Sequence, residues 1–195
     1  TQERAYNGFL KVDRLVIERE NFEGGAPVTL TREVMDRGDA VAILLYDPAQ
    51  DVVVLGREMR AGILHAGEDP FTYSLVAGGV KPKESLTRAV RREVKEEVGL
   101  KVDEVQIIER RLYSSAGGTS ERISIGFGII SAPRGKGKVF GLKTEHEDIQ
   151  RVVMPSTKFF ELSGSRKMPD MMTRIAAYWL QANRPALRQR YAPAT

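Results

Sequence analysis

Cysteine is absent from the 195-residue sequence, and histidine occurs only twice, at His65 and His146. Without cysteine, disulfide frameworks, zinc–thiolate sites, iron–sulfur clusters and cysteine nucleophiles are excluded. Two histidines are too few for a multi-histidine metal site, so any metal ion must be held by carboxylates, which suit Mg²⁺ or Mn²⁺. A chain without cysteine is also compatible with a reducing cytoplasm.

Long apolar segments are missing as well. The run Ala40–Tyr46 is far shorter than the roughly 20 residues that a membrane-spanning helix needs. Residues Thr1–Ala5 contain no apolar signal core. The net charge of +4, from 30 Lys and Arg against 26 Asp and Glu, is too small to indicate nucleic acid as a partner. We therefore expect a cytoplasmic protein without a membrane or nucleic-acid partner, folded as one domain or as one domain with an add-on.

Short β-branched and apolar runs predict strands in two groups. In the first, Phe9–Glu18 and Val28–Met35 flank the turn signal Glu23–Pro27, which predicts an N-terminal hairpin or ribbon. The second group is expected at Val41–Tyr46, Val52–Gly56, Tyr73–Ala77, Val105–Tyr113, Ile123–Ile130 and Val152–Met154. The stretch Ser131–Asp148 reads as a long polar loop, a feature that is often functional in a compact domain.

Helical periodicity is clearest over Lys83–Val98, where the apolar residues form one stripe and Gly99 follows to end the helix. Further helices are predicted at Ser156–Leu162 and Asp170–Ala182, and the basic tail Arg184–Thr195 is expected to fray. Strands, one helix, strands and then helices in this order predict an α/β (α+β) protein with a mixed sheet between helices.

The clearest predicted helix carries a cluster of carboxylates on one face. Glu93 and Glu97 are one turn apart, about 40° around the axis, and Glu96 lies on the flank of that face. Three such carboxylates repel one another unless positive charge lies among them. Arg92 can bind one of them, and Glu84, two turns earlier, can hold Arg92 by a fork-like ion pair. The remaining carboxylates suit a hard divalent cation, although a charged helix face is often merely solvated.

The spacing around this cluster resembles the Nudix box. That pattern is Gly, five residues, Glu, seven residues, Arg-Glu, an aliphatic residue, any residue, Glu-Glu, any residue, Gly and an aliphatic residue. Every fixed position is met, by Gly78, Glu84, Arg92, Glu93, Val94, Glu96, Glu97, Gly99 and Leu100. The resemblance implies the Nudix fold, an α/β/α sandwich with a mixed sheet and a loop–helix–loop catalytic motif. It also implies Mg²⁺-dependent hydrolysis of a nucleoside diphosphate linked to another moiety.

The box also implies a ligand set. Mg²⁺ (or Mn²⁺) would be held by Glu93, Glu97 and Glu96, with the backbone carbonyl of Ala77 as a further ligand. Such cations can neutralise charge on phosphate oxygens and activate water. Arg92 would join Glu93 and Glu97 in the catalytic group.

The resemblance covers most of the chain, from about Gly8 to Leu187, and extends to the bacterial ADP-ribose pyrophosphatase and nucleoside diphosphate sugar hydrolase subfamily. Outside the box it rests on Arg32-Glu33, Arg37-Gly38, Asp47-Pro48, Arg60, Ser114–Arg122, Gly141-Leu142, Glu145–Ile149 and Trp179–Gln181. Members are homodimers whose N-terminal strands cross over to the partner. Residues 1–36 would be that swapped β-ribbon, beside a Nudix catalytic domain at 37–195. A short ribbon cannot bury its faces alone, which independently favours docking on a partner.

By position, eight residues would bind the substrate: Phe9, Arg32, Glu33, Arg37, Arg60, Gly79, Ser115 and Glu121. Phe9 would stack on the adenine, or else be a core aromatic of a strand. Arg60 would contact a phosphate, or be a solvated residue at a strand end. Glu121 would bind the terminal ribose, or pair with Arg122 or Arg110. Arg32, Glu33 and Arg37 would reach the partner's substrate or hold the dimer.

The acidic segment Glu145–Asp148 would supply the remaining chemistry. A flexible acidic loop that faces metal ions can deliver a general base when it closes. By position Glu145 matches the subfamily's catalytic base and Glu147 a further metal ligand, and the match favours Glu145 over the neighbouring His146 as the base. An ordinary solvated acidic loop is the alternative.

One position departs from the subfamily. ADP-ribose hydrolases carry a proline sixteen residues after the box, where this sequence has Ala116. The sequence thus predicts a Nudix pyrophosphatase that converts ADP-ribose to AMP and ribose 5-phosphate, with GDP-mannose or ADP-glucose as alternative substrates. A non-catalytic nucleotide-binding regulator usually loses a ligand of the box, which is intact here. An RNA-cap hydrolase would be supported by a basic–aromatic stripe that the sequence lacks.

Overall fold

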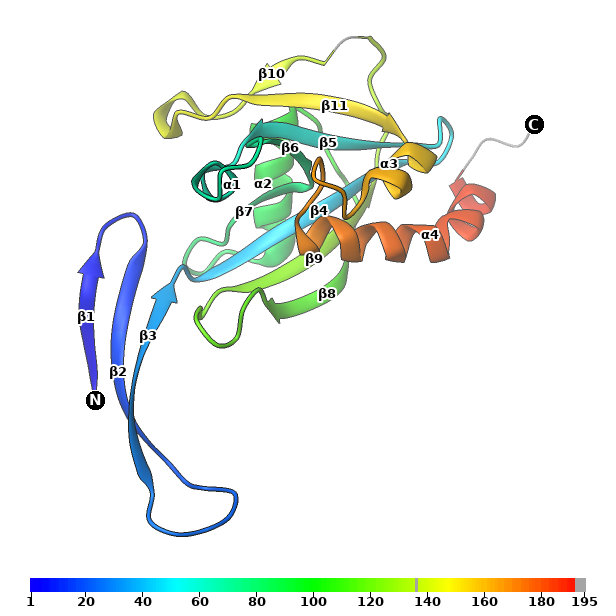
Figure 1. Ribbon diagram of the computed structural model, residues 1–195. Helices are drawn as coiled ribbons and strands as arrows, with labels where there is room; N and C mark the ends of the chain where they lie inside the picture. The colour runs from blue at the N-terminus through cyan, green and yellow to red at the C-terminus, as the bar shows by residue number, and fades with distance from the viewer. Residues whose placement is uncertain (136, 192–195) are drawn as a thin grey trace. The chain divides into compact units, whose positions relative to one another are not determined.

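The computed structural model describes residues 1–135 and 137–191 (Figure 1). The strands are β1 (Gln2–Asn7), β2 (Lys11–Arg19), β3 (Val28–Asp36), β4 (Asp39–Asp47), β5 (Val52–Met59), β6 (Phe71–Ser74), β7 (Val76–Gly79), β8 (Val105–Tyr113), β9 (Arg122–Ile129), β10 (Val139–Phe140) and β11 (Ile149–Pro155). The helices are α1 (Ala61–His65), α2 (Leu86–Val98), α3 (Ser156–Leu162) and α4 (Met171–Tyr191), with a 3₁₀ turn η1 (Lys143–Glu145). None of the helices in these residues combines the length and the apolar character that crossing a membrane requires.

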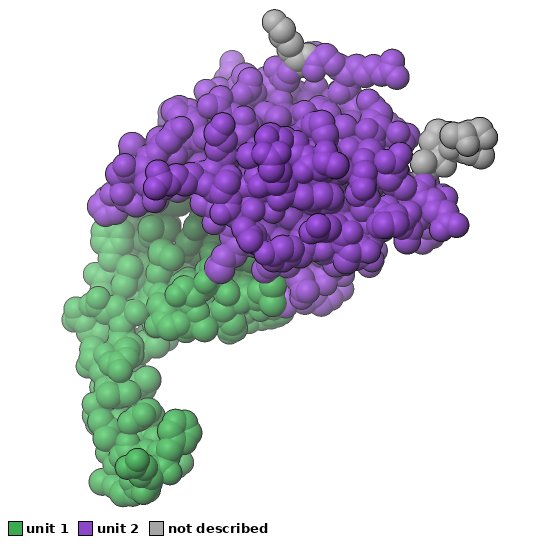
Figure 2. All heavy atoms as spheres, turned by 45° about the vertical axis from the view of Figure 1, so that its right-hand side comes forward, with its two compact units in different colours: residues 1–40, 111–123 green, residues 41–110, 124–195 purple. Residues whose placement is uncertain are grey.

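The chain forms two compact units, coloured separately in Figure 2. The first unit consists of residues 1–40 and 111–123. The second unit consists of residues 41–110 and the described residues from 124 onward.

The first unit is built on a three-stranded antiparallel sheet in the order β1-β2-β3. Segment 111–123 joins it where the Met35 N–H donates to the Gly118 carbonyl (2.9 Å) and the Ser120 N–H donates to the Met35 carbonyl (3.0 Å). Asp13 is buried and pairs with Arg4 at 2.7 Å. Strands β1 to β3 otherwise leave most of their side chains exposed, so this sheet buries little apolar surface within the chain.

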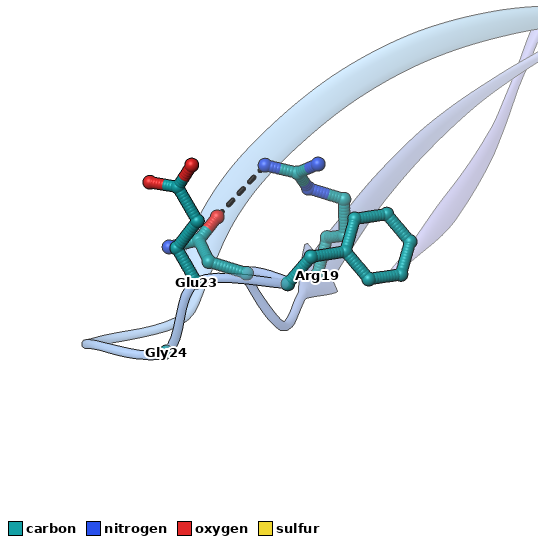
Figure 3. Close-up of a pocket in the computed structure, with 5 residues that line it drawn as sticks. Arg19, Glu23 and Gly24 are labelled. Carbon is teal, nitrogen blue, oxygen red and sulfur yellow. Dashed lines mark hydrogen bonds between the residues drawn. The ribbon is translucent and has the colours of Figure 1, made fainter.

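Side-chain hydrogen bonds close the turn between β2 and β3. Arg19 Nη2 donates to Asn21 Oδ1 (2.8 Å), and Asn21 Nδ2 donates to the Ala26 carbonyl (3.0 Å). A hollow of about 350 Å³ lies at this turn. Figure 3 shows Arg19, Glu23 and Gly24 among the residues that line it. The residues that line the hollow include none of those predicted to bind metal or substrate.

The second unit is built on the larger sheet, in which the strands follow the order β10-β11-β5-β4-β9-β8, with β6 beside β5 and β7 beside β4. Period-two alternation sends alternate residues of β4 to the face that α2 covers, because successive side chains of a strand point to opposite faces. The core on that face includes Val41, Ile43, Leu45, Val90, Val94 and Val98. Figure 1 shows α2 on one side of this sheet and α3 and α4 on the other. The predicted sandwich with a mixed sheet is confirmed.

Helix α2 begins three residues later than the predicted start at Lys83. Lys83 has a positive φ of 63°, which is incompatible with a helix, and Ser85 caps the helix by accepting a hydrogen bond from the Arg88 N–H (3.3 Å). The helix ends as predicted, because Gly99 adopts the left-handed conformation (φ 65°) that glycine reaches without steric cost.

Other predicted boundaries are also corrected. Strand β1 was not expected, because its residues are mostly polar and its register comes from pairing with β2. The strand predicted at Tyr73–Ala77 is divided between β6 and β7, and the loop predicted at Ser131–Asp148 contains β10 and η1. The tail from Arg184 is not frayed, since α4 continues to Tyr191; residues 192–195 lie outside the described part.

Asp51, in the turn between β4 and β5, explains why α4 continues. Its carboxylate accepts hydrogen bonds from Tyr46 Oη (2.7 Å), Ser156 Oγ (2.8 Å) and Arg184 Nε (2.8 Å). Arg184 Nη2 and Arg188 Nη1 also pair with it. Burial alone would raise the pKa of Asp51, but these hydrogen bonds hold it well below its usual range. The carboxylate therefore joins α3 and the last turns of α4 to the sheet.

Replacing Asp51 with Asn is expected to lower the free energy of unfolding by about 2–3 kcal/mol at neutral pH. Asn also tolerates the left-handed backbone of this position (φ 55°), so the loss reports the charge. Because the folded-state pKa lies below the roughly 3.9 of an unfolded Asp, the contribution is complete above about pH 5. It is lost as the pH falls, by about 1 kcal/mol at pH 3.

Urea unfolding of the wild type and Asp51→Asn between pH 7 and pH 3 measures this difference. The exposed Asp103→Asn is the matched control and should change the unfolding free energy little at any pH. A difference for Asp51→Asn that stays constant down to pH 3 would contradict the role given to the charge.

Candidate active site

The acidic residues of α2 lie on its buried face. Glu93 and Glu97 have relative exposures of only 8% and 5%, and they extend the face that Val90 and Val94 bury in the core. Helical periodicity explains this placement, because residues three and four apart share one side of a helix.

Arg92 is the cation of this cluster. Its Nε and Nη2 donate to the two oxygens of Glu84, both at 3.0 Å, which is the predicted fork. Its Nη1 donates to Glu93 Oε1 (2.6 Å) and Glu96 Oε2 (3.3 Å), and Nη2 also reaches the carbonyl of Gly79 (2.8 Å). The hydrogen bonds from Arg92 lower the pKa of Glu84 to about 2. One guanidinium therefore orients three carboxylates.

Glu97 has no such cation among its hydrogen bonds and ion pairs in the described structure. Its Oε2 accepts a hydrogen bond from the Ala77 N–H (3.3 Å). Burial, together with the charges of Glu58 and Glu93, raises the pKa of Glu97 to about 9. Burial also raises the pKa of Glu93, against the opposing effect of Arg92. The site thus holds carboxylates that are costly to ionise without added positive charge.

Glu58 belongs to the same cluster and was missed from the sequence. It lies on β5, and its carboxylate pairs with Arg60 Nη2 (2.9 Å), which also donates to Ser74 Oγ (2.7 Å). Burial raises the pKa of Glu58, with Arg60 opposing and Glu147 reinforcing the shift. The predicted strand ends at Gly56, whereas β5 continues to Met59, so Glu58 lies outside the predicted strand.

The segment after β10 brings a further carboxylate to the cluster. The Leu142 N–H donates to Glu147 Oε2 (2.9 Å), and the Gly141 N–H donates to the backbone carbonyl of Glu96 (3.1 Å). The charge of Glu147 contributes to the raised pKa of Glu58, Glu93 and Glu97. Glu145, in contrast, is exposed in η1.

Six of the eight predicted substrate residues lie in the first unit: Phe9, Arg32, Glu33, Arg37, Ser115 and Glu121. Arg37 pairs with Glu121 (3.6 Å), whose other oxygen accepts a hydrogen bond from Ser114 Oγ (3.3 Å). Arg122 pairs instead with Asp39 (2.8 Å), so the expected alternative of a Glu121–Arg122 pair is wrong. The Ser115 carbonyl accepts the N–H groups of residues 118 and 119, which closes the turn there.

Phe9 lies in the turn between β1 and β2 with 94% of its surface exposed, so the alternative of a core aromatic is wrong. Arg32 and Glu33 are exposed on β3, where Glu33 lies opposite Arg14 across the sheet. Phe9 is thus open to solvent, whereas Arg32 Nη1 donates to the Thr31 carbonyl (2.8 Å) and Glu33 pairs with Arg14 (3.5 Å).

The donor chemistry of the second unit fits a divalent cation. Across residues 1–135 and 137–191, no three acidic or histidine side chains are already arranged as a cation site. Buried carboxylate oxygens are nevertheless the ligands that Mg²⁺ prefers, and crowding that raises their pKa is relieved by an added positive charge.

Gly78 leaves the space that the Glu93 carboxylate occupies. A Cβ atom at position 78 would lie 2.0 Å from Glu93 Oε1, so an alanine there would force this carboxylate to move. We expect Gly78→Ala to reduce kcat by about 10- to 100-fold, which is the typical loss when the groups that orient a metal site are disturbed. The thermal unfolding temperature should change little, since the end of a flexible side chain can yield.

Activity and thermal unfolding of Gly78→Ala are compared with those of Gly62→Ala. A Cβ atom at position 62, on α1, meets no atom within 4 Å, so this control should match the wild type in both measurements. Equal activity of the two variants would show that Glu93 need not occupy the observed position.

Comparison with known proteins agrees with this geometry. The NUDIX domain family matches residues 36–173. The ADP-ribose pyrophosphatase of Escherichia coli (strain K12) is 34% identical over 191 residues, covering 98% of this chain and 90% of that protein. The ADP-ribose pyrophosphatase of Haemophilus influenzae is 30% identical, covering 96% and 87%.

Two further similarities complete the comparison. The GDP-mannose pyrophosphatase of Salmonella typhimurium is 30% identical over 159 residues, covering 82% of each protein. A solved structure described as the crystal structure of an ADP compounds hydrolase shares the fold, with a TM-score of 0.67 and 21% identity over 97% of this chain and 93% of that one. Together with the complete box and its buried carboxylates, these matches show that the chain belongs to the Nudix family and is a Nudix pyrophosphatase.

Proposed function

We propose that this enzyme hydrolyses the diphosphate bond of ADP-ribose to AMP and ribose 5-phosphate with Mg²⁺ as cofactor. The observation that carries the proposal is the buried carboxylate cluster of α2, in which Glu97 has no cationic partner among the described residues. The choice of ADP-ribose is supported by the ADP-ribose pyrophosphatases that align with almost the whole chain.

In this proposal Glu93 and Glu97 hold the Mg²⁺, with Glu96, Glu147 and the Ala77 carbonyl as further ligands. When bound, Mg²⁺ neutralises charge on the phosphate oxygens and lowers the pKa of water. Arg92 keeps Glu93 and Glu96 oriented through its hydrogen bonds. Glu145 would then take the proton of the attacking water when its loop closes, because its exposed position leaves it free to move.

Substrate binding is proposed as the sequence predicts it. Arg60, held by Glu58 and Ser74, would contact a phosphate, and Gly79 would line the pocket. Phe9 would stack on the adenine, with the remaining contacts from Arg32, Glu33, Arg37, Ser115 and Glu121. The exposed sheet of residues 1–36 supports a homodimer in which this ribbon docks on the partner.

A second candidate substrate class has its own support. GDP-mannose pyrophosphatases align with most of the chain, and Ala116 stands where ADP-ribose hydrolases carry proline. Hydrolysis of GDP-mannose or another nucleoside diphosphate sugar is therefore the alternative.

Product analysis separates the two. ADP-ribose, ADP-glucose and GDP-mannose are incubated with the enzyme in Mg²⁺ or in EDTA, and the released nucleotides and sugar phosphates are quantified. We expect release of AMP and ribose 5-phosphate from ADP-ribose that EDTA abolishes. A higher kcat/KM for a hexose nucleotide would replace ADP-ribose as substrate, and no turnover of any would overturn the proposed hydrolysis.

A further inference from the structure

Arg151 of β11 is a buried charge far from the box in sequence. It is only 8% exposed, and its Nη1 donates to the carbonyl of Val98, the last residue of α2, at 2.8 Å. Its guanidinium also lies 4.9 Å from the centre of the Phe140 ring. A cation at a helix C-terminus and above an aromatic face is favourable in both contacts.

The hydrogen bonding of Arg151 is nevertheless incomplete. Within residues 1–135 and 137–191, its Nε is the one buried side-chain nitrogen or oxygen without a hydrogen-bond partner. Burying an unpaired N–H costs free energy, so an apolar side chain of similar length would give a more stable core. This cost indicates a role beyond filling space.

Phe140 connects Arg151 to the acidic loop. Its ring fills the space beside Gly99, where a Cβ atom would lie 2.2 Å from Phe140 Cε1. The next residue, Gly141, donates its N–H to the Glu96 carbonyl, and Leu142 donates its N–H to the Glu147 carboxylate. This series of contacts thus leads from Arg151 to Glu147, whose charge contributes to the raised pKa of Glu93 and Glu97.

We propose that Arg151 is a positioning residue for the hydrolysis: by clamping the Val98 carbonyl and the Phe140 ring, it fixes the loop that carries Glu147 against the carboxylate helix. The inference rests on the proposed function for its kinetic part. Among the described residues, Arg151 contacts the Val98 carbonyl and the Phe140 ring and none of the proposed metal ligands, so it acts through Phe140 and the end of α2.

The test compares Arg151→Met with Arg184→Met. Both remove an arginine of the second unit, but Arg184 pairs with Asp51 and not with the end of α2. Hydrogen exchange of the Gly141 and Leu142 amides, followed by NMR without added metal, should accelerate in Arg151→Met alone. At equal folded fraction, kcat should fall about 10- to 100-fold in Arg151→Met with KM within about twofold, and remain at the wild-type value in Arg184→Met.

Two further variants keep the test informative if Arg151→Met does not fold. Arg151→Lys keeps the charge but loses the planar stacking group, so it should restore part of the kcat. Phe140→Leu should lower kcat like Arg151→Met, and the double variant should lose little more, because both act through one contact.

Three outcomes would overturn the inference: wild-type exchange at Gly141 and Leu142 in Arg151→Met, an equal kcat loss in Arg184→Met, or fully additive losses in the double variant. If the wild type turned over no nucleoside diphosphate compound, the proposed function would fail separately. In that case two measurements test the positioning role in Arg151→Met. Exchange of the Gly141 and Leu142 amides should accelerate, and the affinity for Mn²⁺ should weaken about 10- to 100-fold.

Discussion

Glu97→Gln is expected to reduce kcat by about 1,000-fold and, without metal, to stabilise the fold. The kinetic loss follows because a proposed metal ligand is removed, and metal charge stabilisation is worth several kcal/mol in the transition state. The gain in stability follows from the burial of Glu97 beside Glu58 and Glu93, which makes its ionised form costly. A neutral amide of nearly the same shape avoids that cost.

The sign of the pH dependence is fixed by the pKa of about 9. An unfolded Glu ionises near 4.3, so the folded state binds the extra proton between roughly pH 4.3 and pH 9. The contribution of Glu97 to the free energy of unfolding of the wild type is therefore complete below about pH 4.3 and is lost as the pH rises towards 9. Since Gln does not titrate, the advantage of Glu97→Gln should grow from pH 5 to pH 8.

Urea unfolding in EDTA at pH 5, 6, 7 and 8 measures the advantage, with the exposed Glu104→Gln as control. Added Mg²⁺ should then raise the thermal unfolding temperature of the wild type more than that of Glu97→Gln, because a ligand stabilises the state that binds it. A near-wild-type kcat in Glu97→Gln would refute the catalytic role, and a pH-independent difference would refute the electrostatic one.

Local patterns predicted those parts of the fold that local physics determines. Strand β8 (Val105–Tyr113) and helix α3 (Ser156–Leu162) have the predicted bounds, and β9 begins at Arg122, one residue before its predicted start at Ile123. The fork between Arg92 and Glu84 was predictable because both residues lie on or beside one helix, at fixed spacing.

Contacts between distant segments were not predictable in the same way. Asp51 binds Arg184, and Arg151 binds the Val98 carbonyl, across long separations in sequence that no period of the chain encodes. Glu58 was missed for a related reason, since only the packing of β5 beside α2 makes it a neighbour of Glu97. Periodicity identifies the face on which a residue lies but not the residue that it meets.

Arg92→Met is expected to lower the free energy of unfolding by about 3 kcal/mol and kcat by at least about 100-fold. Methionine preserves length and apolar packing but removes the donors that Glu84, Glu93 and Glu96 share. The carboxylates of Glu93 and Glu96 would then repel each other without compensation. Thermal and urea unfolding, with kcat measured in saturating Mg²⁺, test both expectations.

The control is Arg88→Met, an exposed arginine one turn earlier on α2. It removes the same charge from the same helix but leaves the hydrogen bonds of Arg92 to Glu84, Glu93 and Glu96 intact, so both measurements should stay near the wild type. Arg92→Lys should fall between them, because one ammonium group cannot make the two-pronged contact with Glu84. Arg92 also lowers the pKa of Glu84, so its stabilising effect depends on the ionised carboxylate. The difference in unfolding free energy between wild type and Arg92→Met should therefore shrink as the pH falls from about 4.5 towards 2. If Arg92→Met were as stable and as active as Arg88→Met, the guanidinium would not organise the carboxylates, and the box arginine would need another explanation.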